Sequence, residues 1–492
     1  IIRFIICALF TFFTLVFSLI LFKPILFTSA NSLVSNLKIF DFILEDPSLW
    51  HNFKILYIVT LLFDSIIISN IIYSKFLSNI FIHTHHTQEK SINHNELNLL
   101  IGNSQENKPI YIPEKSLYQN MLITGGIGTG KTASAMYPFT KQLIKYKCDN
   151  PIEKLGFLIL DVKGNYYSKV REFAEEYHRQ NDVIVIELSG KYTYNPLDKP
   201  NLKASILANR IKTILLLFSP NNSESYWLDK SEQVIENFIT FCRMYNNGYV
   251  TFEELHKLIT DKKYYLEKLH EVRRVFLSGV LSDSDIYDLL SCIRFIEKDF
   301  YSLDDRTFNI LKSEITRITN CFVSDYEVLK TFCPTKQKEN FYGFEDTIEN
   351  GKIVVLNLNI GKYKNLSKII AAYLKLDFQT DVITQLSTYV KRPMVFISDE
   401  YQEYVTSSDA EFFAQSREAK CINIVATQSY TSLLHTLNNQ YSVKVIVQNL
   451  VNKLWFRTDD IFTIEDAQKQ IGKEDKEKSS RTISENSKES NY

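Results

Sequence analysis

The stretch Gly125-Gly126-Ile127-Gly128-Thr129-Gly130-Lys131-Thr132 has the G-x-x-x-x-G-K-[ST] spacing of a phosphate-binding loop. The apolar run Met121-Leu122-Ile123 precedes it and the helix-compatible run Ala133-Ser134-Ala135-Met136 follows it, as the motif requires. In such a loop the backbone N–H groups bind phosphate oxygens, the lysine reaches the β and γ phosphates, and the hydroxyl binds Mg²⁺. The sequence therefore predicts a site for ATP and Mg²⁺. The predicted nucleotide-binding residues are Gly125, Gly126, Gly128, Thr129, Gly130, Lys131 and Thr132, of which Thr132 is also a predicted metal ligand.

Short apolar runs that stand before polar or glycine-bearing loops are typical of buried parallel strands. Here they alternate with helix-length segments, which predicts a doubly wound α/β sheet with its ligands at the carboxyl ends of the strands. The phosphate loop follows such an end. The predicted strands are Met121–Ile123, Phe157–Leu160, Val183–Ile186, Ile353–Leu356, Met394–Ile397 and Ile422–Ala426.

Between residues 201 and 340 the strand pattern gives way to helical periodicity. Apolar side chains from Leu207 to Phe218 and from Ile235 to Cys242 recur on one helix face, which predicts an inserted all-α domain. Trp227 and Phe241 fall on or beside these stripes and are expected in its core. The predicted divisions are 1–76 (membrane hairpin), 77–110 (linker and start of the next domain), 111–200 and 341–472 (two parts of the nucleotide-binding domain), 201–340 (insertion) and 473–492 (a charged tail, mobile or truncated).

Two apolar segments precede the nucleotide-binding domain. Ile1–Phe22 is long enough to cross a hydrocarbon core of roughly 30 Å, and Ile55–Tyr73 is a second, less uniform run that includes Asp64. They predict a transmembrane hairpin with a short outer loop from Lys23 to Lys54, and hence a multi-pass protein of the inner (cytoplasmic) cell membrane. An even number of crossings leaves the nucleotide-binding domain cytoplasmic.

Two alternatives to the hairpin remain open. Thr28-Ser29-Ala30 has the small residues of a cleavage site, so the first segment also fits a signal peptide, although a phosphate loop argues against export. The second segment also fits a helix that lies shallow in the membrane. If it crosses, Asp64 is expected to face a neighbouring helix or subunit, because a carboxyl group facing lipid is costly.

Composition narrows the class of protein. With 492 residues and 45% hydrophobic residues the chain can form a large core, which excludes a disordered protein. The 56 basic and 57 acidic residues provide no bulk attraction to nucleic acid, so any such contact needs a local basic patch. The seven cysteines show no C-x-x-C spacing, which favours reduced thiols over disulfides or zinc ligands. His83, His85 and His86 lie in a polar linker and lack thiol partners, so a metal site is not expected there.

A buried strand that ends in two carboxylates, Asp399 and Glu400, is typical of a Walker B element. Asp399 would hold Mg²⁺, and Glu400 would orient and deprotonate the attacking water. Because the two tasks need separate carboxylates, the pair predicts hydrolysis of ATP as well as binding. With Lys131, Glu400 is a predicted catalytic residue.

Arg417 and Gln428 follow in the chain. Gln428 ends a strand, where an amide can sense the γ-phosphate or position water, and an arginine near a sheet edge can reach a neighbouring subunit's nucleotide. By spacing alone, Arg417 fits an ordinary surface arginine better than such a role.

Together these motifs resemble the type IV secretion coupling proteins, the TraG/TraD group within the FtsK/HerA-like branch of RecA-type motors. The resemblance extends from the two apolar segments to about Gly472. It rests on Gly125 to Thr132 with Pro138, Asp161-Val162-Lys163-Gly164, Asn195-Pro196-Leu197-Asp198, Tyr226-Trp227, Asp399-Glu400, Arg417 and Ala426-Thr427-Gln428-Ser429.

The resemblance implies a RecA-like P-loop NTPase domain with an inserted all-α domain and an N-terminal transmembrane hairpin. It implies a homo-hexameric, membrane-anchored ATPase that recruits relaxase-bound DNA or protein and passes it to the channel subunits of a type IV secretion system. The insertion would then face the substrate, and Arg417 and Gln428 would act as finger and sensor. Two departures stand against it: the family usually continues beyond residue 472, and the near-neutral charge does not indicate DNA binding.

Other interpretations stay open. An FtsK-like chromosome translocase is disfavoured by the helical insertion, and an ATP-gated scaffold with little turnover is disfavoured by the adjacent Asp399 and Glu400. Asp161 and Lys163 fit contacts with nucleotide or with a neighbouring subunit about as well as a structural turn. They are therefore not among the predicted catalytic residues.

Overall fold

The computed structural model describes residues 11–13, 16, 46–72, 96–161, 163–164, 166–218, 225–363, 365–387 and 391–473. The chain divides into two compact units, Ile1–Asn95 and Glu96–Tyr492. In the first unit α3 (Pro47–Ile72) contains most of the second predicted membrane segment. Among the described residues no helix is both long and apolar enough to cross a membrane. The first predicted segment, the outer loop, the polar linker and the charged tail lie largely or wholly outside these residues.

The second unit is built on a seven-stranded parallel sheet with the order β5-β6-β4-β7-β8-β3-β9. All six strands predicted from apolar runs are present in it, because strands covered on both faces need side chains that are apolar throughout. The strands are β3 (Met121–Thr124), β4 (Gly156–Leu160), β5 (Val183–Ile186), β6 (Ile353–Leu356), β7 (Met394–Ser398), β8 (Cys421–Thr427) and β9 (Asn452–Trp455).

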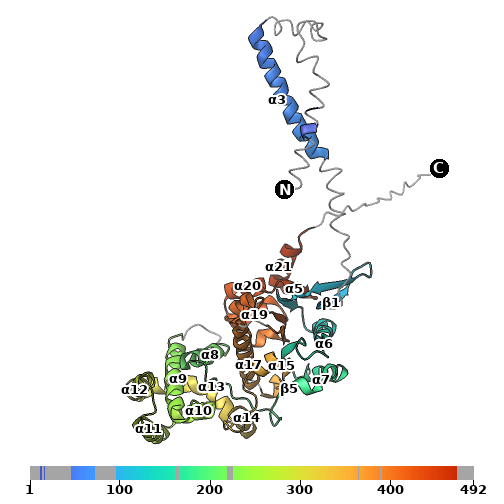
Figure 1. Ribbon diagram of the computed structural model, residues 1–492. Coiled ribbons are helices and arrows are strands. Elements are labelled where there is room, and N and C mark those ends of the chain that lie inside the picture. The colour runs from blue at the N-terminus through green and yellow to red at the C-terminus, as the bar shows by residue number, and fades with distance from the viewer. Residues whose placement is uncertain are drawn as a thin grey trace, which may run out of the picture. The chain divides into compact units, whose positions relative to one another are not determined.

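Helices cover both faces of this sheet. Figure 1 shows α6 (Tyr137–Lys145) and α7 (Tyr166–Glu176) on one side and α17 (Asn365–Thr384) on the other. Alternate side chains of one strand enter the two cores: Phe157 and Ile159 of β4 pack with α6 and α7, whereas Leu158 packs in the core that contains α17. The predicted doubly wound α/β architecture is therefore confirmed.

Three strands were not predicted. β9 has the sequence Asn-Lys-Leu-Trp and is only half-buried at the edge of the sheet, so no apolar run marks it. A separate antiparallel hairpin, β1 (Asn98–Asn103) and β2 (Pro109–Pro113), precedes a short helix, α5 (Glu114–Leu117). It falls at the junction of the predicted linker and the first part of the nucleotide-binding domain.

Around the carboxyl-terminal strands lie smaller helices. They are α15 (Glu345–Asn350), α16 (Ile360–Tyr363), α18 (Asp409–Gln415), α19 (Tyr430–Leu437), α20 (Gln440–Asn449) and α21 (Ile461–Ile471).

The described residues between 204 and 332 are helical apart from short connections, as the periodicity predicts. Figure 1 shows these helices, in green to yellow, gathered at one end of the second unit. Their core is aromatic: Phe252 and Phe322 stack with ring centroids 4.1 Å apart, and Phe241 is fully buried, as expected. The helices are α8 (Ala204–Leu216), α9 (Ser225–Tyr245), α10 (Phe252–Thr260), α11 (Lys262–Leu277), α12 (Asp283–Phe295) with a π-helical end at Ile296–Phe300, α13 (Asp305–Val323) and α14 (Tyr326–Phe332).

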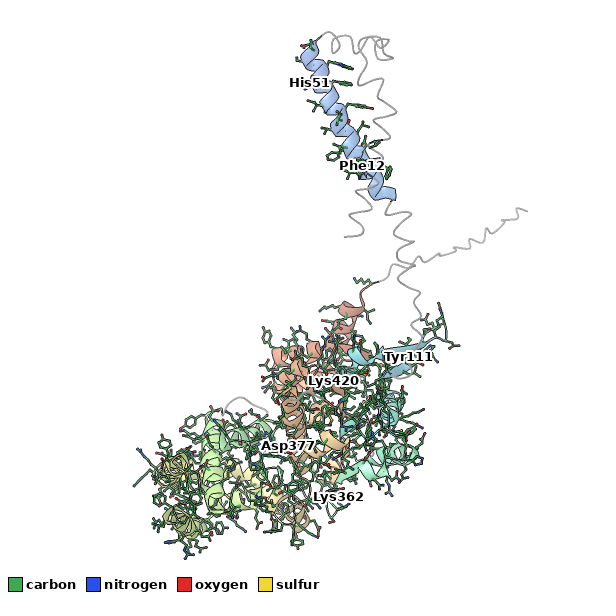
Figure 2. All side chains as sticks on the ribbon, viewed as in Figure 1. Phe12, His51, Tyr111, Lys362, Asp377 and Lys420 are labelled. Atoms are coloured by element: carbon green, nitrogen blue, oxygen red, sulfur yellow. The ribbon has the colours of Figure 1, made fainter. Side chains whose placement is uncertain are left out.

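The chain leaves and re-enters the sheet domain through two adjacent segments, 193–199 and 334–341, which we call the neck. The Asn195 side chain donates to the Val250 carbonyl (2.8 Å), and its backbone N–H donates to Oε1 of Glu339 (3.1 Å). Asp377 of α17 lies where the helical insertion meets the sheet domain, as Figure 2 shows. Its buried carboxylate forms ion pairs with Arg210 (2.6 Å) and Lys199 (3.0 Å).

Candidate nucleotide-binding site

The phosphate loop connects the end of β3 to a π-helical turn, Thr132–Met136, that continues into α6. Gly128 and Gly130 have φ of +74° and +91°, a backbone conformation that glycine adopts with little strain. These two glycines are therefore needed for the shape of the loop.

Gly125 is needed for a different reason, which is space. A Cβ atom at this position would lie 2.5 Å from Cβ of Phe456. The neighbouring Gly126 donates its backbone N–H to the carbonyl of Arg457 (2.8 Å). Phe456 and Arg457, which follow β9 and which no sequence pattern indicated, thus pack against the phosphate loop.

Lys131 is 7% exposed and turns back onto its own loop. Its ammonium group donates to the carbonyls of Gly125 (2.5 Å) and Gly126 (3.1 Å). Burial lowers the pKa of Lys131, and the nearby Glu400 and Asp399 carboxylates act in the opposite direction. The cation is thus held inside the loop, facing the carboxylates that follow β7.

Thr132 and Asp399 meet although 267 positions separate them, with Oγ1 of Thr132 donating to Oδ2 of Asp399 (2.9 Å). Only β8 lies between β3 and β7 in the sheet. The loops that follow β3 and β7 therefore lie close together at the carboxyl ends of the strands. Burial raises the pKa of Asp399, whereas the bond from Thr132 opposes that shift. A hydroxyl and a carboxylate are hard oxygen ligands, so this pair suits Mg²⁺.

Glu400 is 6% exposed and has left-handed backbone angles, φ 50° and ψ 47°, which are uncommon for a residue with a side chain. Its Oε2 accepts hydrogen bonds from the amides of Gln402 (2.5 Å) and Gln428 (3.0 Å), and its Oε1 forms an ion pair with Lys163. Burial alone would raise the pKa of Glu400, but the bonds from Lys163, Gln402 and Gln428 outweigh it and lower the pKa. The carboxylate is therefore kept ionised, as a general base requires.

Two of these contacts involve residues outside the predicted site. The sequence leaves Lys163 open between a structural turn and a contact with nucleotide or a neighbouring subunit, and Gln402 carries no motif that distinguishes it from other glutamines. Gln402 is fixed in turn by the hydroxyl of Thr427, which donates to its Oε1 (2.9 Å). The Lys163 contact follows from the order of neighbouring strands, which the sequence alone does not reveal, whereas the Gln402 contact is local, two positions along the chain from Glu400.

Arg417 does not join the other predicted site residues. It is exposed and lies four positions before β8 begins at Cys421, whereas Gln428 directly follows the end of that strand. Because all strands of the sheet are parallel, Arg417 lies at the amino ends of the strands, whereas the phosphate loop lies at their carboxyl ends. Within one chain it is placed away from the nucleotide-binding residues.

A parallel α/β sheet with a phosphate loop after one strand and a paired carboxylate after another defines a P-loop NTPase fold. The particular group is indicated by comparison. Residues 393–492 match the family described as "TraM recognition site of TraD and TraG". This match includes Asp399, Glu400, Arg417 and Gln428, and it confirms the resemblance to the TraG/TraD group that the motifs predict.

Solved structures with a similar fold were also found. The bacterial conjugative coupling protein TrwBdeltaN70 in its unbound monoclinic form matches with a TM-score of 0.50 and 12% identity, covering 74% of this chain and 74% of that chain. The plasmid coupling protein TrwB in complex with ADP and Mg²⁺ matches with a TM-score of 0.50 and 12% identity, covering 75% of this chain and 77% of that chain. At this identity the similarity concerns the fold. No curated protein matches the sequence significantly.

Proposed function

We propose that this chain is an ATPase of a type IV secretion or conjugation system, which couples ATP hydrolysis to the recruitment and transfer of DNA, relaxase-bound DNA or protein. The observation that carries the proposal is the convergence of Lys131, Thr132, Asp399 and Glu400 at one edge of the sheet. The similarity to TraG/TraD and to the coupling protein TrwB, one form of which holds ADP and Mg²⁺, supplies the context.

The residues present fit Mg²⁺-ATP. The glycine loop packs closely against Phe456, so that a Cβ at Gly125 would displace it, and Thr132 and Asp399 offer oxygen ligands. Mg²⁺, when bound, neutralises charge on the phosphates. The ammonium of Lys131 binds phosphate oxygens in exchange for the loop carbonyls, and the ionised Glu400 orients a water and accepts its proton. Gln428, whose amide donates a hydrogen bond to Glu400, is the proposed sensor of the γ-phosphate.

The proposed assembly is a homo-hexamer. In that assembly Arg417, which lies at the amino ends of the strands, would contribute to hydrolysis only at a neighbouring subunit's nucleotide. In this arrangement each site is completed by the next chain. The helical insertion, joined through the neck, is the part proposed to face the substrate.

We place the protein in the inner cell membrane, anchored in lipid by two transmembrane helices, with its ATPase domain in the cytoplasm. The apolar segments Ile1–Phe22 and Ile55–Tyr73 support this anchoring. The proposed partners are the channel subunits of the secretion system and a relaxase complex. The TraM recognition family that matches residues 393–492 supports contact with an accessory protein of that complex.

The full chain, purified with its N-terminal segment, is expected to hydrolyse ATP when Mg²⁺ is present. Turnover should rise with DNA or on oligomerisation and should be lost in Lys131→Ala, which removes the cation from the loop. Unchanged turnover in that variant would contradict the mechanism. Tight binding of ATP that stays intact for hours in the oligomer would instead favour the nucleotide-gated scaffold.

A further inference from the structure

Lys163 is held in place by a turn that the surrounding residues build for it. The carboxylate of Asp161 accepts the backbone N–H of Lys163 (2.8 Å) and that of Tyr166 (2.8 Å). From the loop after β6, the side-chain amide of Asn359 donates to the carbonyl of Lys163 (2.5 Å). Gly164 follows with φ of +76°, a conformation in which a side chain would be strained.

This turn places Lys163 beside the carboxylate of Glu400, the candidate general base. β4 and β7 are adjacent, and the backbone N–H of Asp399 donates to the carbonyl of Leu160 at the end of β4 (3.1 Å). Lys163 follows β4 and Glu400 follows β7, so their side chains meet at the same edge in an ion pair.

The pair differs from an ordinary surface salt bridge. The Glu400 side chain is 8% exposed, whereas that of Lys163 is 51% exposed. The carboxylate is thus fixed on Oε2 by two buried or half-buried amides and on Oε1 by a cation that reaches in from solvent. Removing the amine would leave Oε1 without its charged donor and the carboxylate able to turn about its remaining bonds.

We infer that Lys163 is a positioning residue for Glu400, whose ion pair fixes the carboxylate that orients the attacking water. The inference rests on the proposed ATPase function and adds a residue to it. Asp161 forms the predicted turn, whereas the contact of Lys163 with Glu400 lies within one chain and differs from the predicted contacts with nucleotide or a neighbouring subunit. A competing role is direct contact between Lys163 and the nucleotide phosphates, and the two roles predict different kinetics.

The test uses the full chain with Lys163→Met, which keeps the unbranched stem of the side chain and removes its charged amine. Loss of orientation should lower kcat roughly 10- to 100-fold, because a misplacement of about 1 Å at a reacting group costs up to about 100-fold. KM for ATP and the equilibrium affinity for a fluorescent, non-hydrolysable ATP analogue should stay unchanged, because the phosphate loop is intact. Lys163→Arg should recover most of the lost rate, since a guanidinium can still donate to Oε1.

Lys169→Met is the matched control. Lys169 is a partly exposed lysine on α7 that pairs with Glu172, so its substitution should alter neither kcat nor affinity. A weaker affinity of Lys163→Met for the analogue, with kcat unchanged, would overturn the inference in favour of a phosphate ligand. An unchanged kcat and affinity would overturn it outright. If the unmodified chain has no Mg²⁺-dependent ATPase activity, the proposed function fails instead, which separates the two outcomes.

Discussion

Glu400 at the phosphate-loop edge and Glu339 at the neck are both buried glutamates, 6% and 4% exposed, yet their surroundings are opposite. Glu400 meets one cation and two amide donors, and these bonds lower its pKa. Glu339 is buried and faces the carboxylate of Asp198, which together raise its pKa to about 8. Burial alone therefore does not set the charge of a carboxyl group, because the donors around it decide.

This difference in charge indicates that the phosphate-loop edge and the neck have different roles. At the phosphate-loop edge an ionised carboxylate is available to accept a proton, and one of its donors reaches it from solvent. At the neck, Asp377 is matched by the cations Arg210 and Lys199, and Glu339 favours its neutral form. The neck is thus built to hold two segments together, whereas the phosphate-loop edge is built to react.

The largest expected effect tests the reactive side of this comparison. Glu400→Gln keeps the hydrogen-bonding shape but removes the proton acceptor, so kcat should fall by about 100- to 10,000-fold. The thermal unfolding midpoint should change little, because the amide still accepts bonds from Gln402 and Gln428. Steady-state ATP hydrolysis and calorimetry measure the two quantities. A variant that keeps its turnover would show that Glu400 is not the base.

The neck should respond in stability rather than in turnover. Arg210→Met leaves the buried Asp377 with only part of its compensating charge, and breaking a buried pair costs about 3–5 kcal/mol. Because Lys199 also pairs with Asp377, the lower end of that range is expected. Urea unfolding of the full chain measures it.

Lys212→Met on the same helix is the matched control for Arg210→Met. Lys212 pairs with Asp229 and Glu232 nearer the surface, where an ion pair contributes about 1 kcal/mol or less. If the two substitutions lower the free energy of unfolding equally, the ion pairs of Asp377 stabilise the chain no more than a surface pair does.

The two regions also differ in how far the sequence predicts them. The phosphate loop and the Asp399-Glu400 pair were found because each follows an apolar strand and has a fixed spacing. Lys163 escaped assignment because its contact with Glu400 depends on which strands are neighbours, whereas Gln402, two positions after Glu400, carries no motif that distinguishes it. At the neck, Asn195 and Glu339 are 144 positions apart, and only the folded chain brings them together. Edge elements such as β9 were missed because half-buried strands need no continuous apolar run.

A smaller effect is expected from the packing of the phosphate loop. Gly125→Ala places a methyl group 2.5 Å from Cβ of Phe456, so the loop or the segment after β9 must shift. We expect the affinity for Mg²⁺-ATP to fall by about 10-fold, equivalent to about 1.4 kcal/mol. In Gly126→Ala the nearest atom would be 3.6 Å away, so a smaller loss is expected. Equilibrium binding of ATP to both variants makes the comparison, and equal losses would refute the role of Phe456.

A pH-dependent effect is expected from the proton at the neck. Since the pKa of Glu339 is raised from 4.5 to about 8 in the folded chain, folding takes up a proton between these values. Its contribution to stability is therefore full below about pH 4.5 and is lost as the pH rises through about 8. Glu339→Gln removes this titration and keeps an acceptor for the N–H of Asn195.

At pH 9 the Glu339→Gln variant should be more stable than the unmodified chain, with the difference shrinking toward pH 5. Unfolding by urea at a series of pH values measures this, and Glu345→Gln, an exposed carboxyl group on α15, is the control. A constant difference across the series would mean that Glu339 stays ionised. The contrast with Glu400 would then reduce to hydrogen bonding, because both glutamates would carry the same charge in opposite surroundings.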